Sequence, residues 1–200
     1  MTIYIAFSIF EFISSITPGP NNLMLLASGV NFGFKKSLPH LLGISIGFFI
    51  LLACVGFGLG QVLTNSPLAF TILKSASAVY LVYLSWAIAM SGEVQDADKS
   101  TGKNPMSFFG AVMFQWVNPK AWIMAISAYS LYVPPNASYK VILFTSALFS
   151  VICLPCILVW LYFGVSLKRF LSNPINLRIF NYTMALLLLL SLFSFVSGEL

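Results

Sequence analysis

The chain has 200 residues, of which 59% are hydrophobic and 8% are charged, and its formal net charge is +5. Soluble domains carry roughly 25% charged residues, so this composition excludes an ordinary water-soluble globular protein. The basic residues lie between apolar runs, where they act as topology signals, and we expect a lipid bilayer and no nucleic acid as partner.

Six apolar stretches are long enough to cross a bilayer core about 30 Å thick, which takes about 20 helical residues. In chain order they are Ile3 to about Val30, Leu41 to Leu63, Leu68 to Met90, Phe108 to Tyr132, Val141 to Val165 and Leu177 to Val196. The segments between them, such as 31–40, are expected to be loops. The most polar loop, 91–105, divides the chain into halves of about 1–92 and 105–200. The sequence therefore predicts a single all-α transmembrane domain over residues 1–200.

Lysine and arginine are unevenly distributed among these loops. One side of the membrane has Lys140, whereas the loops after the first, third and fifth spans hold Lys35, Lys36, Lys99, Lys103, Lys168 and Arg169. The positive-inside rule predicts that these three loops are cytoplasmic and that both termini face outward. Three spans in each half also predict two halves of inverted topology, as in many secondary transporters.

The first span contains the hexapeptide Thr17-Pro18-Gly19-Pro20-Asn21-Asn22. Each proline removes a backbone donor and clashes with the preceding turn, so the helix should unwind here. In the membrane, freed backbone groups are tolerated where they line a cavity or are buried in protein. A half-helix that begins near Pro20, with Thr17 or Asn21 satisfying freed donors, would present N–H groups to a carboxylate. We interpret the hexapeptide as a substrate-binding site, and the alternative is a structural kink.

The fourth span repeats this device with Asn118-Pro119-Lys120. Asn118 can cap a half-helix that begins at Pro119. Lys120 places an ammonium group inside the span, where ionisable groups generally face the bundle interior or a water-filled path. Lys120 is therefore a candidate partner for a substrate carboxylate, unless its side chain extends to the outer interface.

Glu11 is the one acidic residue within the predicted spans, and Lys74 of the third span lies at a similar depth. A pair between Glu11 and either Lys74 or Lys120 would remove two isolated charges from lipid. Glu11 is also a candidate for carrying a coupling proton. The sequence leaves proton coupling and a static ion pair equally open.

A second function is suggested by Cys153-Leu154-Pro155-Cys156. Thiol–disulfide redox proteins use C-x-x-C motifs, so a membrane redox carrier is the main alternative function. The motif lies in the middle of the fifth span, and Cys54 is the one remaining cysteine. These facts favour two small apolar side chains beside a proline.

The segment Gly43-Ile44-Ser45-Ile46-Gly47 matches the nucleophile-elbow pattern of hydrolases. That elbow requires a strand-to-helix turn and a base beside the serine, neither of which a membrane span supplies. The glycines instead favour a small-residue packing face. We therefore expect no enzyme activity, no cofactor and no metal site.

Taken together, these motifs resemble the LysE/RhtB family of amino-acid exporters. The resemblance extends over nearly the whole chain and rests on the hexapeptide 17–22, on Leu73-Lys74 with the segment 78–84, and on Asn118-Pro119-Lys120-Ala121. It implies efflux of a small amino acid or derivative across the bacterial inner membrane, by antiport with protons. The pair Asn21-Asn22 is most similar to the branch that exports cysteine and O-acetylserine.

The family signature, carried onto this sequence, implies binding roles for Pro18, Gly19, Pro20, Asn21, Asn118, Pro119 and Lys120. Glu11 lies outside the pattern of the family. The segment Trp122-Ile123-Met124 departs from the usual run, which leaves the substrate preference open. The expected partners are a small amino acid, protons and the bilayer, and homo-oligomerisation is left open.

Overall fold

The computed structural model describes residues 2–91, 104–171 and 173–197, which form helices and connecting turns without a strand. The all-α prediction is thus confirmed, whereas Lys99 and Lys103 lie outside the described residues. The elements are α1 (Thr2–Ile16), α2 (Pro20–Cys54), the π-helical turn η1 (Val55–Leu59), α3 (Gly60–Asn65), α4 (Pro67–Ala89), α5 (Phe108–Phe114), the 3-10 turn η2 (Gln115–Val117), α6 (Pro119–Tyr132), α7 (Tyr139–Leu167) and α8 (Pro174–Ser197).

Length and apolarity identify the helices that can cross a membrane. Among the described residues, four are long enough to do so, namely Pro20–Asn65, Pro67–Ala89, Tyr139–Leu167 and Pro174–Leu192. Two further apolar helices, Ile3–Ile16 and Phe108–Val117, are shorter. A helix of about 20 residues is needed to span the core, so each short helix requires a continuation to cross it.

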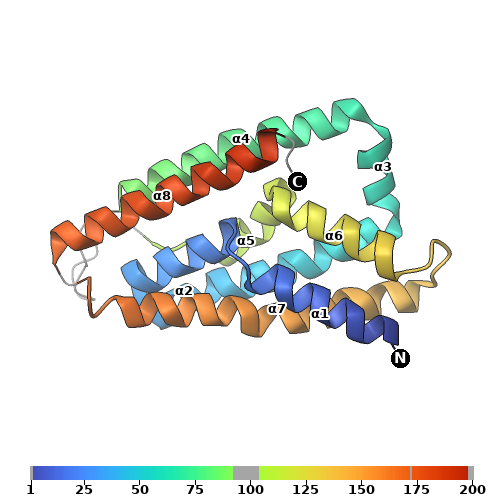
Figure 1. Cartoon of the computed structure of the whole chain (residues 1–200), viewed down its shortest axis with the longest axis horizontal. Coiled ribbons are helices and arrows are strands. Elements are labelled where there is room, and N and C mark those ends of the chain that lie inside the picture. Colours follow the sequence, from blue (N-terminus) through green and yellow to red (C-terminus); the bar gives the residue numbers. More distant parts are fainter. Residues whose placement is uncertain (1, 92–103, 172, 198–200) are drawn as a thin grey trace.

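The chain reverses direction within α2 at Gly33. This glycine has φ 77° and ψ 178°, a backbone conformation that residues with a Cβ atom rarely adopt. Ser28 Oγ and Ser37 Oγ are 2.7 Å apart, although nine residues of continuous helix would separate them by about 13 Å. α2 therefore consists of two segments, before and after Gly33, that lie antiparallel (Figure 1). The predicted loop at 31–40 is wrong, because this single residue makes the turn.

The helices are arranged in two layers (Figure 1). α4 and α8 pack side by side in one layer, and α2 packs against α7 and α1 against α7 in the other. α5 and α6 pack against α2. One apolar core joins α1, α2, α6 and α7, and a second joins the start of α2 to α4, α5 and α8. The start of α2 therefore contributes to both cores.

α2 and α7 approach closely because each helix has a glycine that packs against the backbone of the other. A Cβ atom on Gly29 would lie 2.6 Å from the carbonyl oxygen of Leu161. A Cβ atom on Gly164 would lie 2.3 Å from the carbonyl oxygen of Leu26. Any larger residue at either position would push the two helices apart.

The segment 43–47 forms a packing face against α5, in agreement with the interpretation favoured from the sequence. A Cβ atom on Gly43 would lie 2.4 Å from the carbonyl oxygen of Phe108, and one on Gly47 would lie 2.7 Å from Val112 Cα. Ser45 lies within a helix, and its hydroxyl donates to the carbonyl oxygen of Ser150 at 3.5 Å. The segment therefore lacks the strand-to-helix turn of a nucleophile elbow.

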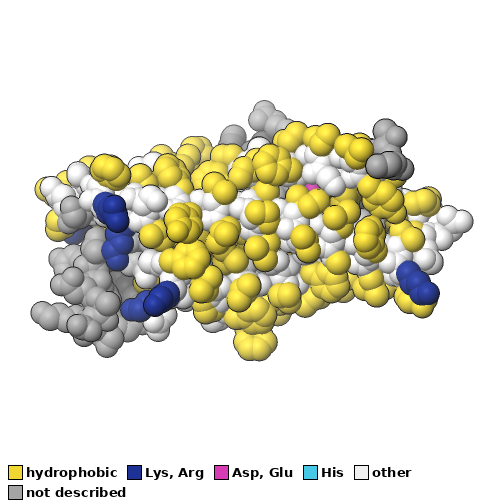
Figure 2. Space-filling model, turned by 90° about the horizontal axis from the view of Figure 1, so that it is seen from below, with side chains coloured by type: hydrophobic (Ala, Val, Ile, Leu, Met, Phe, Trp, Pro, Cys, Tyr) yellow, Lys and Arg dark blue, Asp and Glu magenta, His cyan; other side chains and the backbone are white. Residues whose placement is uncertain are grey.

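The outer surface of the bundle is apolar. Val79 and Phe109 are 74% and 76% exposed. Figure 2 shows hydrophobic side chains over most of one face, with lysine and arginine side chains confined to its two ends and most of them at one end. Lipid around the middle of the molecule and polar media at both ends account for this distribution.

Candidate functional site

Residues 17–19 leave helical geometry between the end of α1 at Ile16 and the start of α2 at Pro20, and we call them the first interruption. Gly19 is extended, with φ −176° and ψ 175°. Pro20 takes the first helical position, where the backbone N–H would have no partner within the helix, so its absence costs no hydrogen bond. The last carbonyl groups of α1 therefore need partners from outside that helix.

Residues 115–118 form the second interruption, between α5 and α6. They comprise η2 and Asn118, whose backbone is extended with φ −86° and ψ 107°. The expected cap is wrong here, because no side chain caps the start of α6. Asn118 Oδ1 is instead buried and has no hydrogen-bond partner in the structure. No side chain caps the start of α2 either, so Thr17 and Asn21 do not fill that role.

Lys120 connects the second interruption to the first. Its Nζ donates to the carbonyl oxygen of Thr17 at 2.9 Å, to Thr17 Oγ1 at 3.0 Å and to the carbonyl oxygen of Pro18 at 3.2 Å. An ammonium group has three donors, and all three are directed at the first interruption. A Cβ atom on Gly19 would lie 2.7 Å from Lys120 Cδ, so the glycine makes room for the lysine side chain. Lys120 therefore lies inside the bundle, bound to backbone.

Asn21 makes the reciprocal connection. Its Nδ2 donates to Gln115 Oε1 at 2.9 Å, and Gln115 Nε2 donates to Asn21 Oδ1 at 3.1 Å and to the carbonyl oxygen of Ala111 at 3.0 Å. The residue after each helix-starting proline, Asn21 or Lys120, thus contacts the opposite interruption. The sequence interpretation did not single out Gln115. The one signal in the sequence is a glutamine within an apolar span, three residues before Asn118, and the structure shows that this glutamine is fully buried.

Asn22 supports the end of α1. Its Nδ2 donates to the carbonyl oxygen of Ser15 at 2.8 Å and to that of Thr17 at 2.7 Å. The side chain is 4% exposed. Asn22 therefore satisfies carbonyl groups that a continuous helix would have bonded to its next turn.

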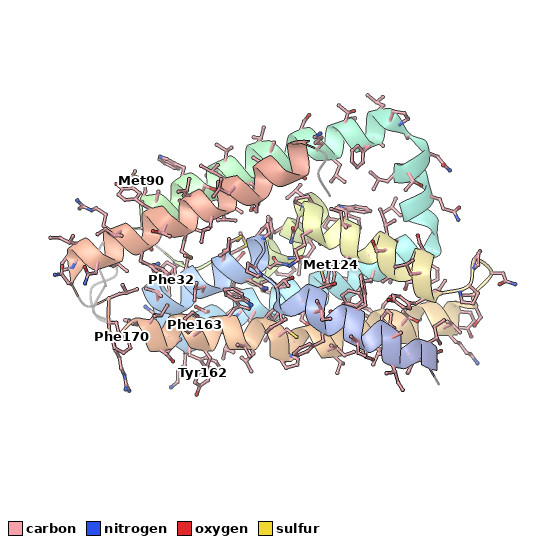
Figure 3. All side chains as sticks on the ribbon, viewed as in Figure 1. Phe32, Met90, Met124, Tyr162, Phe163 and Phe170 are labelled. Atoms are coloured by element: carbon pink, nitrogen blue, oxygen red, sulfur yellow. The ribbon has the colours of Figure 1, made fainter. Side chains whose placement is uncertain are left out.

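Two cavities lie beside the interruptions. One has a volume of about 30 Å³, which holds water but no amino acid, and is lined among others by Ser15, Asn21, Asn22, Asn118, Lys120 and Cys153. The other has a volume of about 460 Å³ and is lined among others by Thr17, Pro18, Gly19, Pro20, Pro119 and Lys120. Met124 of α6, labelled in Figure 3, borders both. The larger volume is in the range of small-molecule sites.

Glu11 is fully buried within α1, one turn before Ser15. Ser15 Oγ donates to Glu11 Oε1, and Glu11 Oε2 has no hydrogen-bond partner in the structure. A pair of Glu11 with either of the two lysines stays a prediction. The hydrogen bonds of Lys120 go to the first interruption, and Lys74 lies on α4, which packs mainly against α8.

The cysteines of the C-x-x-C motif are free thiols on α7. Cys153 and Cys156 are both buried, and Cys54 is also free. Cys156 Sγ donates to the carbonyl oxygen of Ile152 at 3.3 Å, within its own helix. Among the described residues, there is no second thiol pair and no cluster of metal-binding side chains. The structure gives the redox-carrier alternative no support.

The apolar exterior, the helical bundle and the cavities at its two interruptions are typical of a polytopic membrane transport protein. The family model for LysE type translocators matches residues 12–197. Proteins described as cysteine/O-acetylserine efflux proteins, from Escherichia coli (strain K12) and Shigella sonnei (strain Ss046), are each 35% identical to this chain over 136 residues, which are 68% of either length. No solved structure matches the chain significantly. The chain belongs to the LysE type translocator family, as its motifs indicated.

Proposed function

We propose that the protein exports a small zwitterionic amino acid, or a close derivative, across the bacterial inner membrane in exchange for protons. One observation carries this proposal. Two helices, α2 at Pro20 and α6 at Pro119, begin without a side-chain cap, and both begin beside cavities that Lys120 also lines. Helix N-termini bind carboxylates through free N–H groups and the positive end of the dipole. The efflux of cysteine and O-acetylserine by the relatives supports a substrate of that size.

The proposed arrangement has six membrane passes in two inverted halves. α1 has 15 residues and is too short alone, but α1 with the first segment of α2 is long enough to cross. The second segment of α2 continues through η1 and α3 to make the second pass, and α4 is the third. In the other half, α5, η2 and α6 together make the fourth pass, followed by α7 and α8. Each half then carries one interruption, and the two meet inside the bundle.

The orientation follows from charge. On the face shown in Figure 2, most lysine and arginine side chains lie at one end, and we assign that end to the cytoplasm. An even number of passes then places both termini in the periplasm. The substrate would enter at the basic end and leave at the opposite end.

Transport would depend on competition for Lys120. In the structure its three donors are bound to Thr17 and Pro18, and the cavity of about 30 Å³ is too small for an amino acid. A substrate carboxylate that takes one of these donors would weaken the contact between α6 and the first interruption. This change is of the kind that lets one half of a transporter move against the other.

Glu11 is placed to respond to the same event. Its bonded partner Ser15 lines the cavity that contains Lys120, so the carboxyl group is one side chain away from the site. The unpaired Oε2 is an acceptor for a proton. We propose that Glu11 binds a proton on one side of the membrane and releases it on the other.

The proposal is tested with inside-out membrane vesicles that contain the full chain, supplied with labelled O-acetyl-L-serine or L-cysteine. We expect the label to accumulate when the vesicle interior is acidic and to leave when a protonophore is added. Vesicles with a Lys120→Ala protein at the same membrane level should not accumulate it. Equal accumulation in vesicles without the protein would refute the proposal for these two substrates.

A further inference from the structure

A third cavity, of about 680 Å³, lies apart from the interruptions and shares no lining residue with the two cavities described above. It is lined by the first segment of α2, by His40 of the second segment, by the last turns of α4 with the two residues that follow, and by residues 104–106. Figure 3 labels Phe32 of α2 and Met90, the residue directly after α4, and both line the cavity. Figures 2 and 3 together place it toward the end where most basic side chains gather. Its volume is typical of a site for a small molecule.

Three of the polar side chains that line this cavity are already hydrogen-bonded, namely Ser28, Asn31 and Ser91. Asn31 Nδ2 donates to Asn181 Oδ1 at 3.1 Å, and Asn181 Nδ2 donates to the carbonyl oxygen of Ser91 at 2.5 Å. Ser28 is paired with Ser37. The walls of the cavity therefore hold a fixed polar network.

His40 differs from these residues. Its side chain is 1% exposed and lines the cavity, yet neither Nδ1 nor Nε2 has a hydrogen-bond partner in the structure. A buried polar group without partners is costly, and native proteins keep such a group where a ligand, an ion or a water completes it. The imidazole offers one N–H donor and one acceptor when neutral. A ligand that accepts from one nitrogen and donates to the other would satisfy both.

We propose that this cavity is a loading site for the exported amino acid, in which the His40 N–H binds the substrate carboxylate; the proposal rests on the export function given above. A zwitterionic amino acid has the required acceptor and donor groups. Asn31 Oδ1 keeps a lone pair that can accept from the ammonium group, and the ring of Tyr80 can attract that group through its face. The ligand class is therefore an α-amino acid with a free carboxylate.

The first segment of α2 connects this loading site to the interruptions. Met24, Ser28 and Asn31 line the cavity, and Asn21 lines the small cavity beside Lys120. The spacing of three, four and three residues places them all on one face of the helix. Ten residues of helix separate Asn21 from Asn31, a distance of about 15 Å. A substrate that leaves His40 can thus follow one helix face to Lys120.

A direct test uses the fact that His40 is the one histidine in the sequence. The full chain, freed of any affinity tag and labelled with ¹⁵N-histidine, is reconstituted in lipid nanodiscs and titrated with O-acetyl-L-serine. We expect a saturable shift of the imidazole signals. A Lys120→Ala protein should show the same shift, because the loading site does not include Lys120. No shift up to the concentration that saturates transport would overturn the proposal.

Transport kinetics supply a second test. In inside-out vesicles, His40→Ala should raise the KM for O-acetyl-L-serine roughly tenfold or more, because a hydrogen bond to a charged group is lost, with little change in the maximal rate. His40→Gln, which keeps a donor and an acceptor, should recover part of the affinity. The control is Ser150→Ala, which removes another buried polar group without a hydrogen-bond partner but outside this cavity, and its KM should stay unchanged. An unchanged KM in both His40 variants would reject the loading site while export stands, whereas absent transport by the unaltered chain would reject export itself.

Discussion

Lys120 Nζ lies 2.9 Å from the carbonyl oxygen of Thr17, although 103 residues separate the two in sequence. The amide pair of Asn21 and Gln115 makes the same connection in the opposite direction. Neither interruption is therefore stabilised by its own helices alone. Each interruption depends on a side chain from the other half of the chain. A substitution at one interruption should therefore alter the contacts of the other.

The first prediction concerns the ammonium group of Lys120. Lys120→Met keeps most of the side-chain length but removes all three donors, and transport of O-acetyl-L-serine should fall at least tenfold. Hydrogen bonds to a charged group contribute about 1.5–3 kcal/mol each, which supports a loss of ten- to a hundredfold. Lys120→Arg retains the charge with a different geometry and should be less impaired. Wild-type rates in Lys120→Met vesicles, with matched protein levels, would show that the ammonium is dispensable.

The second prediction concerns the pair of Asn21 and Gln115. Asn21→Ala and Gln115→Ala should each lower the thermal stability in detergent, and the double variant should lose less than the sum of the two. The expected coupling is about 0.5–1.5 kcal/mol, the net contribution of a hydrogen bond between neutral groups, with the buried amide that is left unpaired adding to each single effect. Strict additivity would mean that the two amides do not interact in the membrane-embedded protein.

Proline and glycine made the positions of the interruptions predictable from sequence. Pro20 and Pro119 each occupy the first position of a helix, as the rules for proline require. The partners were less predictable, because they depend on contacts between segments about 100 residues apart. Lys120 was predicted as a candidate partner for a substrate carboxylate, which stays a prediction, and its contacts with Thr17 and Pro18 were not predicted.

The turn at Gly33 and the role of Gln115 were not predicted. The segment 31–40 contains lysines, an asparagine and a proline, which are typical of a loop, but a single residue at positive φ makes the reversal and helix continues on both sides. Gln115 belongs to no motif, and nothing in its local sequence indicates the residue that it contacts. A positive φ at one glycine and a side-chain pair between distant segments are properties of the tertiary structure. Hydrophobic periodicity predicts neither of them.

The third prediction concerns the contact of α2 with α7. Gly164→Ala should lower the melting temperature by several degrees, because its Cβ atom would lie 2.3 Å from the carbonyl oxygen of Leu26 and overpacking costs about 1–3 kcal/mol. Gly110→Ala is the matched control. Its Cβ atom would meet the side chains of Ser107 and Met106 at 3.1 and 3.2 Å, and these can move. Equal melting temperatures for the two variants, measured by fluorescence in detergent, would argue against the close helix contact.

The fourth prediction concerns topology. Reporter fusions after Met90 should be active in the cytoplasm, and fusions after Asn65 or Leu200 should be active in the periplasm. The basis is the position of most basic side chains at one end of the face shown in Figure 2. A cytoplasmic reporter at Leu200 would require an odd number of passes and would remove the paired inverted halves.

The last prediction concerns the first interruption itself. Changing Pro18 and Pro20 to alanine restores two backbone donors and favours helix by about 3 kcal/mol for each proline in a helix interior. Gly19 should be left in place, because a Cβ atom there would lie 2.7 Å from Lys120 Cδ and would disturb the lysine directly. With a continuous helix, the carbonyl groups of Thr17 and Pro18 would bond to the next turn and no longer to Lys120.

The Pro18→Ala, Pro20→Ala protein should therefore insert normally, since it is no more polar than the original, yet lose transport of O-acetyl-L-serine. The control is Pro155→Ala, which removes a proline from the interior of α7, where it lines neither cavity at the interruptions. Its transport should be largely retained. If the double variant transports at the normal rate, the interruption is a structural kink, and the carboxylate site assigned to the start of α2 is wrong. If both variants lose transport, proline removal acts through general flexibility, and the special role of residues 17–19 is likewise refuted.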